Sequence, residues 1–220
     1  MTPRLLFLAF TALASAQEAA APAAPAPQKV DFETLMPGAV PDEFMSTDQE
    51  AKFVIAADGE KNKVLELQGQ PIVDGGMLVG KAVKGPATIT ARIKATGKRR
   101  VQPRFGVGLY GISGPRIRVV PVTKTVEIVK NTDKEEVVAT APYTWTSGTW
   151  IKIEMTVKAA ASGGGSTIEA RVWDDGKPRP EKATVTWENP AAAAQGRASV
   201  WGTPYSEQAI WFDDIEIKTP

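Results

Sequence analysis

Apolar and polar residues alternate along most of this chain, and turn residues separate the alternating runs. The clearest runs are residues 88–94, 104–110 and 150–158, in which every second side chain is apolar. Further runs lie at 30–33, 52–56, 64–67, 116–120, 125–129, 136–139, 167–173 and 184–187, with two closing runs inside 196–205 and 209–218. A period of two is typical of a strand with one buried face, so the sequence predicts about a dozen short strands.

The spacing of these runs predicts an all-β protein. Turn signals recur every ~8–12 residues, and no run after the N-terminal segment has the period of an amphipathic helix. One-sided polarity favours antiparallel pairing, and the absence of a fixed repeat argues against a propeller or a β-helix. We therefore expect a two-sheet antiparallel β-sandwich of the jelly-roll type, with the two closing runs as neighbouring last strands.

The N-terminal segment has the features of an export signal. Arg4 precedes an apolar run at 5–10, and Ala14-Ser15-Ala16 forms a small-residue cleavage site. Residues 17–28 are rich in alanine and proline and are predicted to form an extended linker before a β-sandwich domain at 29–220. We expect cleavage after Ala16 and a secreted or periplasmic protein. No later run reaches the ~20 apolar residues of a membrane span, so no membrane insertion is expected.

Composition excludes several classes of chemistry. The 220 residues include 26 basic and 25 acidic side chains, a formal net charge of +1, which gives no reason to expect a nucleic-acid partner. The chain has no cysteine, so neither a disulfide framework nor a lipidated N-terminal cysteine is available. Without histidine or cysteine, imidazole bases, thiol nucleophiles and histidine-ligated zinc are excluded.

Four segments together resemble a known group of folds. They are Asp31-Phe-Glu33 with Pro41, Arg171–Gly176 with Pro180, Gly196–Trp201, and Phe212–Ile215. The pattern resembles the concanavalin A-like lectin/glucanase jelly rolls, and within them the laminin-G-like and 3-keto-disaccharide-hydrolase-like domains of exported bacterial proteins. The resemblance implies two bent antiparallel sheets and a role related to glycans. The glucanases of that group carry catalytic carboxylates as Glu-x-Asp-x-Glu, but no Glu-x-Asp occurs in this chain. The balance is therefore against an enzyme.

Two adjacent carboxylates, Asp213 and Asp214, interrupt the last alternating run. Acidic residues are poor strand formers, so this pair indicates a bulge, a buried polar anchor or a metal ligand. The resemblance would bring Glu33 of the first strand to Asp213 or Asp214, with backbone carbonyls near Gly38 completing a calcium site. The alternative is that the two carboxylates accept backbone hydrogen bonds at a bulge or pair with a basic side chain.

A second candidate site follows from the outward faces of the predicted strands. Gly106 and Gly108 leave a strip without side chains on the outward face of their strand. On the next strand, Arg116 and Arg118 share one face. Four outward side chains are predicted to line a ligand-binding groove: Arg104, Tyr110, Arg116 and Trp173. Flat aromatic rings with flanking polar donors are typical of sugar sites. The alternative is that a tryptophan from a neighbouring strand fills the glycine strip.

Three functional hypotheses follow. The first is a secreted, non-catalytic domain that binds carbohydrate or a cell-envelope partner. The second is a purely structural or interaction domain of the cell envelope, joined to its partner by the linker. The third is a divergent glycoside hydrolase or lyase of the concanavalin A-like group. A calcium ion in a structural role is compatible with all three.

Overall fold

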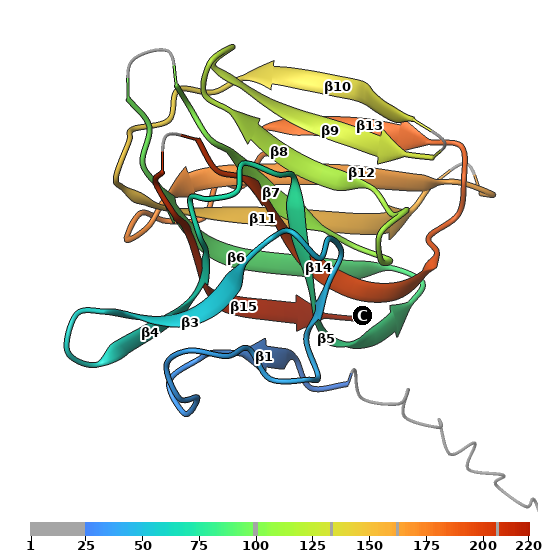
Figure 1. The fold of residues 1–220 in the computed structure, drawn as a ribbon. Coiled ribbons are helices and arrows are strands. Elements are labelled where there is room, and N and C mark those ends of the chain that lie inside the picture. The colour runs from blue at the N-terminus through green and yellow to red at the C-terminus, as the bar shows by residue number, and fades with distance from the viewer. Residues whose placement is uncertain (1–24, 99–100, 133, 162, 206) are drawn as a thin grey trace, which may run out of the picture.

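The computed structural model describes residues 25–98, 101–132, 134–161, 163–205 and 207–220. The predicted export signal and most of the predicted linker lie outside these residues. The described residues form fifteen strands and no helix, and thus no helix that is long and apolar enough to cross a membrane. The strands build two antiparallel sheets that lie face to face (Figure 1), which confirms the predicted all-β sandwich.

The first sheet has eight strands. Seven run in the order β13 (Val185–Asn189), β12 (Ser166–Asp174), β11 (Trp150–Ala159), β6 (Ala87–Ala95), β15 (Ile210–Lys218), β4 (Asn62–Leu67) and β3 (Phe53–Asp58). The eighth, β1 (Gln28–Val30), pairs with the second half of β15, beyond the stretch that pairs with β4. The N-terminal strand therefore lies beside the C-terminal one.

The second sheet has seven strands. Their order is β10 (Glu135–Pro142), β9 (Thr125–Asn131), β8 (Arg116–Val120), β7 (Arg104–Gly108), β14 (Gln195–Thr203), β5 (Gly75–Lys84) and β2 (Met45–Ser46). All its strand pairs are antiparallel. β7, β8 and β14 are its central strands, and they position the candidate site described below.

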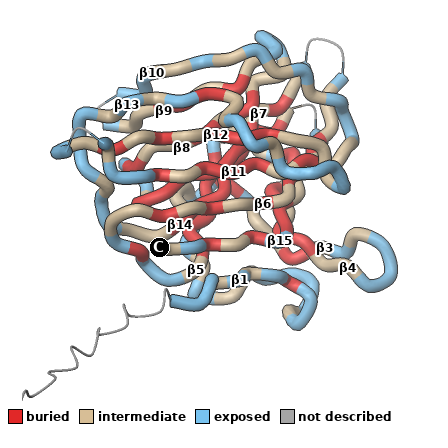
Figure 2. Tube along the Cα trace, turned by 180° about the vertical axis from the view of Figure 1, so that it is seen from behind, coloured by how far each residue is buried: buried red, intermediate tan, exposed pale blue. Residues whose placement is uncertain are grey.

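The apolar side chains of the alternating runs fill the space between the sheets. Ile89, Ala91 and Ile93 of β6 are fully buried, as the alternation predicts, and their neighbours Thr90 and Arg92 point outward. Figure 2 shows the buried positions concentrated on the central strands. In strands where burial alternates, such as β6 and β8, every inward residue fixes an outward one beside it.

The placement of the closing strands differs from the prediction. β14 lies between β7 and β5 in the seven-stranded sheet, whereas β15 lies between β6 and β4 in the other sheet. The turn between them therefore crosses from one sheet to the other. Alternation gives the buried face of a strand but carries no information about its neighbour, which explains the error.

Three further segments depart from the sequence prediction. The sequence prediction does not include β5, because Gly75, Gly76 and Gly80 interrupt the alternation of apolar and polar side chains. The pairing of β5 with β14 also contains a bulge. The first strand ends at Val30, so the predicted strand at 30–33 is wrong for most of its length. The turn residues of the stretch 144–150 predict a hairpin turn or a binding loop, but residues 144–149 connect the two sheets, with Trp145 packed edge-on against Phe105 at 5.4 Å.

The central position of Phe212 gives a stability prediction. Its side chain is 0% exposed in β15, so Phe212→Ala removes buried area and leaves a cavity. We expect a loss of about 3–5 kcal/mol in the free energy of unfolding, measured by urea denaturation. Met36→Ala, at a residue that is 83% exposed, is the control and should change stability by less than about 0.5 kcal/mol. Equal losses in the two variants would contradict the described core.

Candidate functional site

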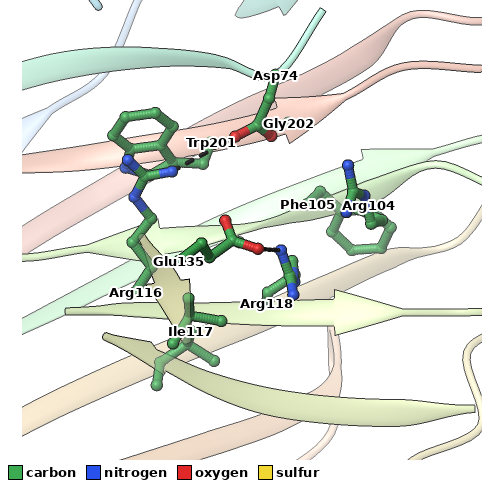
Figure 3. A pocket seen from close by; sticks show the side chains of 11 residues that line it. Asp74, Arg104, Phe105, Arg116, Ile117, Arg118, Glu135, Trp201 and Gly202 are labelled. Carbon is green, nitrogen blue, oxygen red and sulfur yellow. Dashed lines mark hydrogen bonds and ion pairs between the residues drawn. The ribbon is translucent and has the colours of Figure 1, made fainter. Parts of the chain in front are cut away.

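The outer face of the seven-stranded sheet carries a small pocket of about 300 Å³, part of it open to solvent. Alternation in β7 and β8 turns Phe105 and Ile117 toward the core and sends Arg104, Arg116 and Arg118 outward. Figure 3 shows these three arginines beside Trp201, Asp74 and Glu135. Strand geometry thus gathers three guanidinium groups on one face.

Trp201 forms the floor of this pocket. It lies opposite Gly106 on β7 and opposite Gly76 on β5. A Cβ atom at Gly76 would lie 2.6 Å from the Trp201 ring, so the ring needs a glycine at that position. Its Nε1 donates a hydrogen bond of 2.7 Å to Ser199 Oγ. The alternative interpretation of the glycine strip is confirmed at Gly108, where a Cβ atom would lie 3.1 Å from Trp201 Nε1, whereas a Cβ atom at Gly106 would meet the Ile117 carbonyl oxygen.

The guanidinium group of Arg116 stacks on Trp201, with Cζ 3.1 Å from the ring centroid. Only 11% of the Arg116 side chain is exposed, and its carboxylate partner is Asp74 at 3.4 Å. A further hydrogen bond of 3.2 Å runs to the carbonyl oxygen of Ile112. Burial lowers the pKa of Arg116, and the charges of Asp74 and Glu135 act in the opposite direction. The Arg116 cation is therefore desolvated and only loosely paired.

Arg118 is firmly paired. Its Nε and Nη2 donate to Glu127 at 3.1 and 2.8 Å, and its Nη1 donates to Glu135. Burial works to lower the pKa of Arg118, but the hydrogen bonds and charges of the two glutamates prevail, and the pKa is raised. Two carboxylates thus compensate this one guanidinium group.

Arg104 is the least compensated of the three arginines. Its Nη2 donates to Thr203 Oγ1 at 3.4 Å, and it forms no ion pair with any described carboxylate. The same Thr203 hydroxyl donates to Asp74 at 2.6 Å. The Nε atoms of Arg104 and Arg116 are buried without a hydrogen-bond acceptor. Buried donors without acceptors are rare in folded proteins, and the described residues hold two more outside this pocket, Arg92 Nε and Trp145 Nε1.

The structure brings two of the four predicted groove residues to this pocket, Arg104 and Arg116. Tyr110 lies past the end of β7 with a φ of 69°, and its hydroxyl donates to Gly85 O at 2.7 Å. Burial raises the pKa of this hydroxyl. Trp173 lies on β12 of the eight-stranded sheet, where it pairs with Lys152 of β11, and not in the sheet that carries the pocket. The four residues therefore do not share one groove.

Sequence reasoning missed three members of the pocket: Asp74, Glu135 and Trp201 as its floor. Asp74 directly precedes β5, the strand that the sequence prediction overlooked. Glu135 is the first residue of β10. Alternation does not show which strand a given strand pairs with, so the position of β10 beside β9 could not be predicted from it. The usable signal was the spacing of Arg116 and Arg118, which places two cations on one face of a strand.

The paired carboxylates of β15 form a bulge on the opposite side of the molecule. The pairing of β15 with β6 shifts register between Asp213 and Glu216, and Asp214 has a φ of 46°. Asp213 is 1% exposed and accepts hydrogen bonds from Asn62 Nδ2 at 3.1 Å and from the Asp214 amide at 2.8 Å. Arg92 pairs with both carboxylates, at 3.6 and 3.1 Å. The interpretation as a bulge with a buried polar anchor is confirmed.

The proposed calcium ligands are engaged in other contacts. Glu33 lies beyond β1 and accepts a hydrogen bond from the Lys63 amide at 3.1 Å, and the Gly38 carbonyl accepts one from Ile55 at 2.9 Å. The described residues contain no group of three or more acidic side chains arranged to hold a metal ion. The contacts of these donors give no support to the predicted calcium site. Calcium binding stays a prediction, which thermal unfolding with and without added calcium tests.

Comparison with protein-family models finds no match, and comparison with curated proteins finds none either. Solved structures of similar fold do exist. A carbohydrate binding module, CBM66 from Bacillus subtilis, superposes with a TM-score of 0.57 at 9% identity, covering 80% of this chain and 96% of the module. Peanut lectin gives a TM-score of 0.52 at 12% identity, covering 88% of this chain and 97% of the lectin.

An enzyme also shares the fold. The GH43 protein BlXynB from Bacillus licheniformis gives a TM-score of 0.57 at 8% identity over 87% of this chain, which corresponds to 39% of that protein. Identities this low establish the fold alone. The chain therefore has the two-sheet jelly-roll fold of these lectin-like structures, the fold that the sequence resemblance implied.

The burial of Asp213 gives a pH prediction. Burial is the main cause that raises its pKa above the ordinary value of 3.8, despite hydrogen bonds from the Asp214 amide and Asn62. The folded protein therefore holds this proton more tightly than the unfolded chain. The resulting stabilisation is fully present below the ordinary pKa and is lost as the pH rises through the raised one.

Urea denaturation of the wild type and of Asp213→Asn from acidic to neutral pH measures this effect, because the variant lacks the titrating group. We expect the wild type to lose stability relative to the variant as the pH rises. A relative gain of the wild type over the same range would show that the ion pair with Arg92 outweighs burial.

Proposed function

We propose that this protein binds a glycan in the pocket on the outer face of the seven-stranded sheet. The observation that carries the proposal is the cluster of Arg104, Arg116, Asp74 and Glu135 around the Trp201 floor. A sugar hydroxyl both donates and accepts hydrogen bonds, and this cluster offers guanidinium donors and carboxylate acceptors within one pocket. A few polar groups that converge over an apolar floor are typical of small-molecule sites.

The arrangement of the floor decides how a sugar would lie. Trp201 is only 7% exposed because the guanidinium of Arg116 covers its ring. A sugar therefore meets the planar guanidinium group, held flat by the ring beneath, and not the bare indole. A guanidinium group fixed in this way loses little side-chain entropy when it forms hydrogen bonds.

Two further points support a glycan as the ligand. The similar folds include a carbohydrate binding module and a lectin. The predicted export signal would place the protein in the periplasm or outside the cell, where the linker at 17–28 gives the domain reach toward a surface. On this view the protein acts as a secreted glycan-binding domain, and a cell-envelope protein is the alternative partner.

One observation favours a hydrolase as the second candidate. Asp74 and Glu135 line the same pocket, and paired carboxylates are the usual catalytic groups of glycosidases. Each of them is engaged by an arginine, however, Asp74 by Arg116 and Glu135 by Arg118. Ion pairing of both carboxylates suits binding better than it suits proton transfer to a leaving group.

Retention on insoluble polysaccharides tests the glycan proposal. We expect the wild type to be retained on at least one polysaccharide, and Arg104→Gln and Arg116→Gln to bind roughly tenfold more weakly, since each loses a charge-assisted hydrogen bond. Arg179→Gln is the matched control, because Arg179 is an exposed arginine paired with Glu154 on the other sheet. Retention on no glycan, or equal retention of all variants, would reject the proposal.

Turnover of the retained glycan separates binding from hydrolysis. We expect no increase in reducing ends over the uncatalysed rate when the wild type is incubated with soluble fragments of that glycan. Release of reducing ends that is abolished both by Asp74→Asn and by Glu135→Gln would instead identify a hydrolase.

A further inference from the structure

Asp74 places a carboxylate of the protein itself beside Arg116 in the pocket. We propose that the glycan recognised here carries a carboxylate, as a uronic acid or a sialic acid does, and that this group replaces Asp74 on Arg116 while also reaching Arg104. The inference rests on the proposed function and specifies the chemical class of the ligand.

The charges of the pocket are unevenly paired. Arg118 takes two of the three nearby carboxylates, Glu127 and Glu135. Arg104 and Arg116 are left with Asp74, which contacts only Arg116. Two guanidinium groups on one face thus share a single carboxylate, and each also holds a buried Nε without an acceptor. The three arginines and the three carboxylates cancel in formal charge, but the pairing leaves Arg104 without a carboxylate partner among the described residues, and a ligand carboxylate would supply one.

The contact between Asp74 and Arg116 is weak, as we expect of a side chain that a ligand carboxylate replaces. Its Oδ2 lies 3.4 Å from Arg116 Nη1, longer than the ~2.7–2.9 Å of a good charge-assisted hydrogen bond. Its Oδ1 accepts from the Thr203 hydroxyl, which is also the hydrogen-bond partner of Arg104. Asp74 therefore lies next to the partner of Arg104 without an ion pair to Arg104 itself.

The position of Asp74 allows it to be displaced. It belongs to the segment that leads into β5, and 46% of its side chain is exposed, so it can turn to water at the expense of its contact with Arg116 and its hydrogen bond from Thr203. Arg116 has no such freedom, because it is stacked on Trp201. A ligand carboxylate in the place of Asp74 would accept from Arg116 and lie beside Thr203, the hydrogen-bond partner of Arg104, and burial strengthens such contacts.

Matched pairs of sugars that differ only in charge test the inference. The probes are tetragalacturonate with its methyl ester, and 3′-sialyllactose with the methyl ester of its sialic acid, measured by isothermal titration calorimetry. We expect the wild type to bind at least one acid roughly tenfold more tightly than its neutral partner. Asp74→Asn should tighten binding of that acid about threefold or more, because the internal competitor is gone, and should not tighten binding of the neutral partner, which gains nothing from its removal.

Two controls make the result specific. Arg104→Gln should remove the preference for the acid. Asp214→Asn makes the same change at an exposed aspartate that pairs with Arg92 on the other sheet, and should leave every affinity unchanged. Thermal unfolding of each variant checks that it is folded.

The outcomes separate this inference from the proposed function. Retention on neutral polysaccharides without preference for either acid, or weaker acid binding by Asp74→Asn, would overturn the inference and leave glycan binding intact. Failure to bind any glycan, charged or neutral, would overturn both.

Discussion

The constraint on which this structure depends is that each strand of a two-sheet sandwich has one side for the core and one side for solvent. Burying Ile117 and Val119 of β8 between the sheets sends Arg116 and Arg118 outward, and burying Phe105 does the same for Arg104. The hydrophobic core therefore determines which cations share a face. The chemistry of the pocket follows from the packing that stabilises the fold.

Trp201 converts this row of cations into a pocket. Its ring lies on the outer face because Gly76 leaves room for it, and its indole nitrogen is satisfied by Ser199. The ring then holds Arg116 flat, while two glutamates hold Arg118. The pocket thus has Trp201 as its floor and Arg118 paired with two glutamates. Arg104 and Arg116 are less well paired, and their guanidinium groups give the site its hydrogen-bond donors. In the eight-stranded sheet, Arg92 instead compensates the buried carboxylate of Asp213.

Sequence alternation predicted most of the fold and only part of the site. It identified the inward face of β6 and the shared face of Arg116 and Arg118, because both depend only on the period of a strand. It failed where glycines removed the period, as in β5, and where strand order mattered, as for β14 and β15. Asp74 belongs to the site only through the position of β5, so no local pattern revealed it. The predicted partnership with Arg104 failed for Tyr110 because this residue lies past the end of β7 with a positive φ, and for Trp173 because β12 belongs to the other sheet.

The central claim is that ligand binds on the outer face of the seven-stranded sheet. The most direct measurement is the change in backbone amide NMR shifts when a retained oligosaccharide is added to the isotope-labelled protein. The account predicts that the largest changes fall on β7, β8 and the part of β14 around Trp201, with further changes at Asp74 and Glu135. Changes centred on β6, β11 and β12 of the other sheet would contradict it.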